Sequence, residues 1–211
     1  MAEALFNPLH VSWIVWWITF GCAFINGLSK SGIKGIGMVS VPVLAYFYGG
    51  MASSGILLPF LIFGDLFALH HYRTSVKWRN IRSLLPWSIA GILLAVAVGK
   101  FISDDVFRNI MAIAVMICLA VILYFDFAGK KTGISDYPVL SKITGLSGGF
   151  ATMIGNAAGP IFDVYLLSMR LPKETFLGTA AIFFLILNLF KLPLHFFVWH
   201  SVSWSSLQMN L

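Results

Sequence analysis

Long apolar runs alternate with short polar loops along almost the whole chain. A helix that crosses a bilayer needs roughly 20 apolar residues. Runs close to that length lie at 11–26, 53–72, 84–102, 106–127 and 175–200. Shorter apolar runs lie at 38–48, 141–154 and 159–169. The pattern predicts an all-α polytopic membrane protein with about seven or eight membrane segments.

Two glycine-rich stretches interrupt these runs. Residues 25–44 read INGLSKSGIKGIGMVSVPVL, and residues 146–166 read LSGGFATMIGNAAGPIFDVYL. Glycine permits non-helical backbone, and Pro42 and Pro160 have no N–H to donate, so both stretches are expected to break a helix. Unwound backbone is tolerated in a membrane only where protein or a wet cavity satisfies it. The short segments beside the breaks are either re-entrant half-helices or thin, tilted crossings.

The two halves of the chain can be aligned on these breaks. The alignment matches Gly27 with Gly149, Gly37 with Gly159, and Asp65 with Asn188. It also matches a basic loop, 75–78, with a loop that has no Lys or Arg, 201–204. Loops of such different charge should face opposite sides of the membrane, which predicts inverted-topology repeats.

The alignment also predicts where each repeat begins and ends. Residues 1–127 form the first repeat, with five membrane segments, and residues 128–211 form the second, with three. The second repeat therefore lacks counterparts of the last two segments of the first. On this expectation the chain is C-terminally truncated relative to a complete pair of repeats.

Composition and charge narrow the class of protein. Only 10% of the 211 residues are charged, against roughly 25% in soluble domains. The net charge of +6 lies in short loops, which favours the positive-inside rule over nucleic-acid binding. The loop at 73–83 is strongly basic and residues 1–10 have no Lys or Arg. We therefore expect the N-terminus outside and the 73–83 loop in the cytoplasm.

Three segments carry a resemblance to a known family. They are GIKGIGMVSVPVLAYFYGG at 32–50, GLSGGFATMIGNAAGPIFDVYLL at 145–167, and LPKETFLGTAAIFFLILNLFKLPLHF at 171–196. Together they resemble the TauE/SafE sulfite exporters, a family of bacterial inner-membrane anion transporters. The resemblance implies transport of small sulfur-containing or organic anions across the inner (plasma) membrane. Lys34 departs from the family's glycine run in the first copy, as do Asn156, Ala157 and Ala158 in the second.

The broken stretches supply the candidate substrate site. Helices that begin near Ile36 and Gly159 would point backbone N–H groups and a partial positive charge at an anion. The candidate substrate-binding residues are Gly32, Lys34, Gly35, Gly37, Gly155, Asn156, Gly159, Asn188 and Lys191. The alternative is that the glycines only allow helices to pack closely. For Lys34, a snorkelling position at a helix end is equally open.

Asp65, Asp163 and His195 are the candidates for a coupling proton or sodium ion. Asp65 lies near the middle of an apolar run, where a carboxylate is costly and indicates function. A structural salt bridge from Asp65 to Lys34 or Lys191 is the alternative. Lys191 and His195 are four residues apart and share a helix face. That face either lines the cavity or reaches the headgroups.

These observations predict a secondary transporter that works by alternating access around the two breaks. A membrane enzyme would need a nucleophile–base pair or a metal site, and the sequence offers neither that arrangement nor zinc spacing. It has no Walker A loop, which argues against ATP-driven pumping. A non-transporting scaffold or half-transporter subunit is the alternative function. We expect no cofactor and leave a homo-oligomer open.

Overall fold

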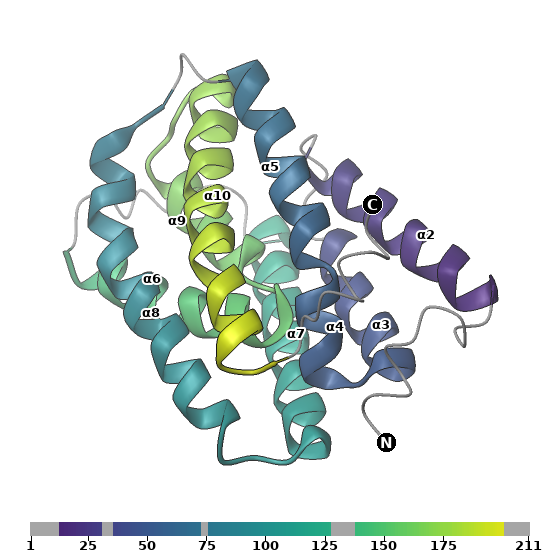
Figure 1. Cartoon of the computed structure of the whole chain (residues 1–211). Helices are drawn as coiled ribbons and strands as arrows, with labels where there is room; N and C mark the ends of the chain where they lie inside the picture. Colours follow the sequence, from purple (N-terminus) through teal and green to yellow (C-terminus); the bar gives the residue numbers. More distant parts are fainter. Residues whose placement is uncertain (1–12, 31–35, 73–75, 128–137, 201–211) are drawn as a thin grey trace.

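The computed structural model describes residues 13–30, 36–72, 76–127 and 138–200 (Figure 1). Within these ranges the chain forms helices and no strand. The helices are α2 Trp13–Lys30, η2 Ile36–Val39, α3 Ser40–Tyr48, α4 Gly50–Ile56, α5 Leu58–Tyr72, α6 Trp78–Gly99, α7 Asp104–Phe127, α8 Pro138–Gly155, α9 Gly159–Ser168 and α10 Lys173–Phe197. The all-α prediction is therefore confirmed.

Three helical stretches in the described residues are long and apolar enough to cross a membrane: Gly50–Tyr72, Trp78–Gly99 and Lys173–Phe197. Shorter apolar helices cover Trp13–Ser29 and Ile36–Tyr48. Each apolar run of the sequence corresponds to a helix or to a pair of consecutive helices. The total number of membrane segments and the repeat relationship stay predictions.

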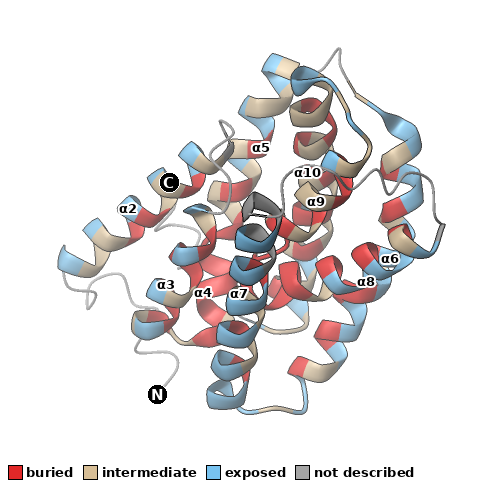
Figure 2. Ribbon diagram, turned by 180° about the vertical axis from the view of Figure 1, so that it is seen from behind, coloured by how far each residue is buried: buried red, intermediate tan, exposed pale blue. Residues whose placement is uncertain are grey.

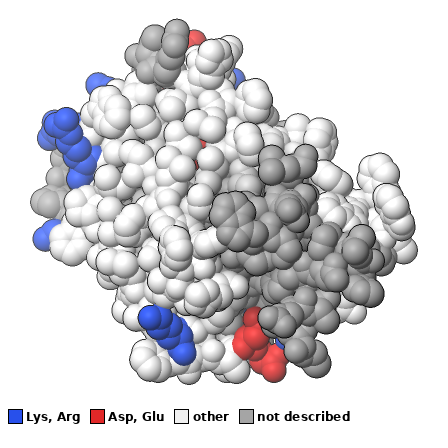
Figure 3. Space-filling view, viewed as in Figure 1, with Lys and Arg blue, Asp and Glu red and all other residues white. Residues whose placement is uncertain are grey.

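The outward faces of the helices are apolar. Trp13, Trp17, Phe67 and Ile113 each expose more than half of their surface, at 83%, 74%, 76% and 59%. In Figure 2 the buried residues face the centre of the bundle and the outer faces of α2 and α7 are exposed. Figure 3 shows charged side chains near the edges of the molecule and few between them. A soluble protein rarely exposes so much contiguous apolar surface, and a membrane protein exposes it to lipid.

Glycines allow α6 and α8 to pack in backbone contact. A Cβ added at Gly149 would collide with the backbone of Ser88, and one added at Gly91 would collide with the backbone of Leu146. Small residues at a helix crossing are the usual device for close packing in membranes. Part of the second glycine-rich stretch therefore serves packing, as the alternative interpretation of the sequence proposed.

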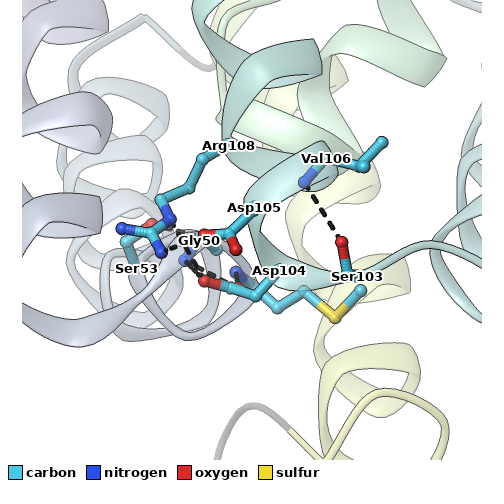
Figure 4. Close-up of polar contacts among 8 residues, drawn as sticks. Gly50, Ser53, Ser103, Asp104, Asp105, Val106 and Arg108 are labelled. Carbon is cyan, nitrogen blue, oxygen red and sulfur yellow. Dashed lines mark hydrogen bonds and ion pairs between the residues drawn. The ribbon is translucent and has the colours of Figure 1, made fainter.

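A carboxylate fixes the start of α4. The side chain of Asp104, at the start of α7, accepts hydrogen bonds from the Gly50 N–H at 2.9 and 3.1 Å and from the Met51 N–H at 3.2 Å (Figure 4). Gly49, with φ 92°, turns the chain between α3 and α4. The first N–H groups of a helix have no partner inside it, so Asp104 caps α4 from a distant segment.

Helices α5 and α10 lie side by side across the middle of the bundle (Figure 1). On α10, the polar residues Asn188, Lys191 and His195 recur at intervals of three and four, which places them on one face. Each is at most 2% exposed. The packing of α10 against its neighbours thus carries a polar stripe into the interior.

Candidate functional site

A cavity of about 420 Å³ lies between the two breaks. Gly37 and Met38, in η2 after the first break, form part of its wall, and so do Gly159 and Pro160, at the start of α9 after the second. The polar side chains that line the cavity are Asn26, Ser29, Asp65, Thr152, Asn156, Asp163, Lys173 and Asn188. Segments from both halves of the sequence therefore enclose one space.

Asn156 forms the second break. Its φ is 49°, in the left-handed region that ends helices, and its N–H donates to the Thr152 carbonyl at 3.1 Å. Glycine adopts this left-handed conformation most readily, and among residues that carry a side chain asparagine tolerates it well. Helix α8 therefore ends at Gly155, and after three residues the chain resumes as α9.

The Asn156 side chain ties the break to two other helices. Its Nδ2 donates to the Ser54 carbonyl at 3.0 Å, and its Oδ1 accepts from Lys191 Nζ at 2.6 Å. A carbonyl only accepts and an ammonium only donates, so both contacts require the same orientation of the amide. The break is thereby fixed to α4 and α10.

Lys191 is fully buried, at 0% exposure. Its Nζ also donates to the carbonyl and the hydroxyl oxygen of Thr152, both at 3.1 Å. Thr152 lies in the last turn of α8, where the helix dipole is negative, and its carbonyl accepts from both the Asn156 N–H and the ammonium. The ammonium of α10 thus neutralises the C-terminal end of α8.

Asp65 and Asn188 meet between α5 and α10. Asn188 Nδ2 donates to Asp65 Oδ2 at 2.7 Å, and the residues are 2% and 0% exposed respectively. These are the two positions that the alignment of the halves matches. A carboxylate so far from bulk water is costly unless it is hydrogen bonded or protonated.

The charges around the cavity are mixed. Among the described residues, the ionisable side chains that line it are Asp65, Asp163 and Lys173. The N-terminus of α9, at Gly159 and Pro160, adds a partial positive charge. An anion here would be attracted by Lys173 and α9 and repelled by the carboxylates unless a cation or proton accompanies it.

Some of the candidate residues from the sequence line the cavity and others do not. Gly37, Asn156, Gly159, Asn188, Asp65 and Asp163 line the cavity. Lys191 lies behind the wall, bonded to Asn156, and Gly155 faces Met111 of α7. Gly32, Lys34 and Gly35 lie outside the described residues.

His195 lies apart from the cavity. Its ring packs edge-on to Trp199, with centroids 5.2 Å apart, and it is fully buried. Lys191 and His195 are both buried inside the bundle, and their roles stay predictions. Neither residue lines the cavity, whereas Asn188, on the same face of α10, does.

Sequence reasoning missed Thr152, Asn26 and Ser54. Thr152 and Asn26 line the cavity. The Ser54 carbonyl accepts from Asn156 Nδ2, and the Ser54 hydroxyl donates to the Met153 carbonyl, both at 3.0 Å. Thr152 precedes Asn156 by one helical turn, which is the spacing that could have identified it. In the described residues, no group of three or more His, Cys, Asp or Glu side chains could hold a metal ion.

The family model described as "Sulfite exporter TauE/SafE" matches residues 17–211. The chain belongs to the TauE/SafE sulfite exporter family. The match spans both breaks, the cavity and α10, so the family assignment covers the whole candidate site. No curated protein and no solved structure matches the chain. As a TauE/SafE protein with long apolar helices, it is a multi-pass membrane protein of a transporter family.

Proposed function

We propose that the protein is a secondary transporter of the bacterial inner membrane that moves sulfite or another small sulfur-containing or organic anion. The observation that carries the proposal is the cavity shared by both breaks in a chain of the TauE/SafE family. Broken helices that meet near the middle of the bundle are the usual binding site of secondary transporters. The anion would lie between the start of α9 and Lys173.

The cavity extends toward one end of the bundle. Its lining runs from Asp65 and Asn188 to Leu171 and Lys173, at the turn between α9 and α10. The positive-inside rule assigns that turn, like the 73–83 loop, to the cytoplasm. This orientation, with the N-terminus outside, makes the arrangement an inward-facing state.

The opposite end of α10 is closed by packing. Trp199 lies edge-on to Phe107, with ring centroids 5.3 Å apart, and a Cβ added at Gly99 would strike the Trp199 ring. Trp199 Nε1 donates to the Val96 carbonyl at 3.4 Å. Opening to the outside would require Trp199 to move away from α6 and α7. We propose that the repeats, residues 1–127 and 128–211, rock against each other to achieve this.

The carboxylates supply the coupling site in this proposal. Asp65 and Asp163 would repel an anion while ionised, so a proton or metal cation bound to either one would favour anion binding. The reciprocal coupling then ties the movement of the two ions together. A homo-oligomer is compatible with this mechanism and is not required by it.

Anion-dependent thermal stability tests the proposal. A ligand that binds only the folded protein raises its melting temperature by mass action. We expect sulfite, sulfate, thiosulfate or a short sulfonate or carboxylate to raise the melting temperature of the purified protein. The rise should be lost in Lys173→Ala and retained in Lys100→Ala, whose side chain lies at the far end of α6. Absence of a shift with every anion would favour the non-transporting scaffold.

A further inference from the structure

The buried ammonium of Lys191 donates to three oxygens of one segment. Its Nζ contacts the Thr152 carbonyl and hydroxyl at 3.1 Å and the Asn156 amide oxygen at 2.6 Å. All three oxygens belong to the last turn of α8 and the residue that ends it. A main-chain carbonyl, a hydroxyl and an amide oxygen thus converge on one positive charge.

Oxygens of this kind are ligands for hard metal cations. Main-chain and side-chain carbonyl oxygens coordinate such ions in proteins. At broken helices of secondary transporters, unwound carbonyls and the C-terminal ends of half-helices coordinate sodium. The end of α8 likewise brings three oxygens together, and the α10 ammonium lies among them.

We propose that Lys191 is a tethered substitute for a sodium ion, so that the protein transports its anion without sodium. The proposal rests on the proposed function and narrows its choice of coupling ion. A covalently attached cation balances the α8 dipole in this conformation and is not released with the substrate. The charge that sodium would bring in each cycle is therefore permanent.

The fixed charge also has a positional consequence. Asn188 and His195 lie one turn before and after Lys191 on the same face of α10, and Asn188 holds Asp65. The contacts of Lys191 set the distance of this face from the second break. During transport, α10 and the end of α8 must therefore either move together or break the contacts between the ammonium and the three oxygens.

The test removes the tether and offers the ion. The protein is purified as wild type, Lys191→Ala and Lys191→Met, and its melting temperature is measured in sodium, potassium and choline chloride at equal ionic strength without any anion substrate. Alanine leaves the three oxygens without the ammonium, so Lys191→Ala should gain a melting-temperature rise that saturates with sodium and does not occur in choline. The methionine side chain fills the space, so Lys191→Met should show no sodium response.

Wild type and Lys100→Ala, a matched change at an exposed lysine, should melt at the same temperature in all three salts. If Lys191→Ala is recovered folded only when sodium is present during extraction, that result also supports the proposal. A folded Lys191→Ala that does not respond to sodium would overturn the proposal. A Lys191→Ala protein that cannot be recovered folded with or without sodium would overturn it as well. Anion flux by the wild type that falls in choline would overturn it too.

These outcomes separate the two proposals. The sodium measurements contain chloride at constant concentration and no anion substrate, so the difference between sodium and choline reports on the end of α8 alone. Anion-dependent stability of the wild type reports on the proposed function. A sodium response of Lys191→Ala together with no anion response of the wild type would retain the cation site and reject the transport of these anions.

Discussion

Replacing Asp104 with alanine should destabilise the protein although the residue lies at the surface and far from the cavity. Asp104 accepts from the N–H groups of Gly50 and Met51 and also lies 3.3 Å from the Arg108 side chain. Losing a helix cap costs about 1 kcal/mol, and a buried N–H left unpaired costs about 1–3 kcal/mol. Water can reach the vacated position because the Asp104 side chain is 44% exposed. We therefore expect the free energy of unfolding to fall by about 1–2 kcal/mol.

The neighbouring residue provides a matched control. Asp105 is 84% exposed, and its described contact is the ion pair with Arg108 at 2.7 Å. An exposed pair of this kind contributes little, so Asp105→Ala should cost less than about 0.5 kcal/mol. Asp104→Asn keeps one acceptor oxygen and should fall between the two. The free energies would be measured by equilibrium unfolding in mixed micelles followed by circular dichroism. Equal losses in Asp104→Ala and Asp105→Ala would refute the capping argument.

Three further changes test other parts of the structure. Gly149→Ala should destabilise the protein by about 1–3 kcal/mol because its methyl group collides with the Ser88 backbone, whereas Gly21→Ala, with open space around it, should be neutral or stabilising in the same unfolding assay. Asn156→Gly should be more stable than Asn156→Ala by roughly 1 kcal/mol. Both variants lose the Lys191 contact, but only alanine is strained at φ 49°, so equal stabilities would contradict this reasoning. Asp65→Asn should fold and bind anion while losing gradient-driven accumulation in proteoliposomes, and unchanged accumulation would remove Asp65 from the coupling mechanism.

The sequence predicted the helices well because a membrane segment must satisfy its own backbone and present an apolar surface to lipid. It also located the second break, at residues 156–158 between α8 and α9, since Gly and Pro act on the local backbone; residues 31–35, at the centre of the first glycine-rich stretch, lie outside the described residues. Whether a given glycine serves helix packing or lines the cavity was not predictable from the sequence. Gly149 packs against α6 whereas Gly159 lines the cavity, and both belong to the same stretch. Which neighbour a glycine meets depends on tertiary packing.

The partners of the buried polar residues were equally hidden. Four-residue spacing placed Lys191 and His195 on one face but did not reveal that only Lys191 reaches the second break. The hydrogen bond between Asp65 and Asn188 joins residues 123 positions apart. Their match in the alignment of the halves is the one sequence signal that related them. Gly32, Lys34 and Gly35 stay predictions.

Blocking the cavity tests most directly the claim that an anion passes between the two breaks. Ala180 lines the cavity on α10, and a phenyl ring there would project into the cavity and narrow it. Ala112, exposed on α7, offers the same substitution on the outer surface. We expect Ala180→Phe to fold and to lose sulfite flux in proteoliposomes, while Ala112→Phe retains it. A folded Ala180→Phe that transports sulfite as fast as the wild type would show that the anion takes another route.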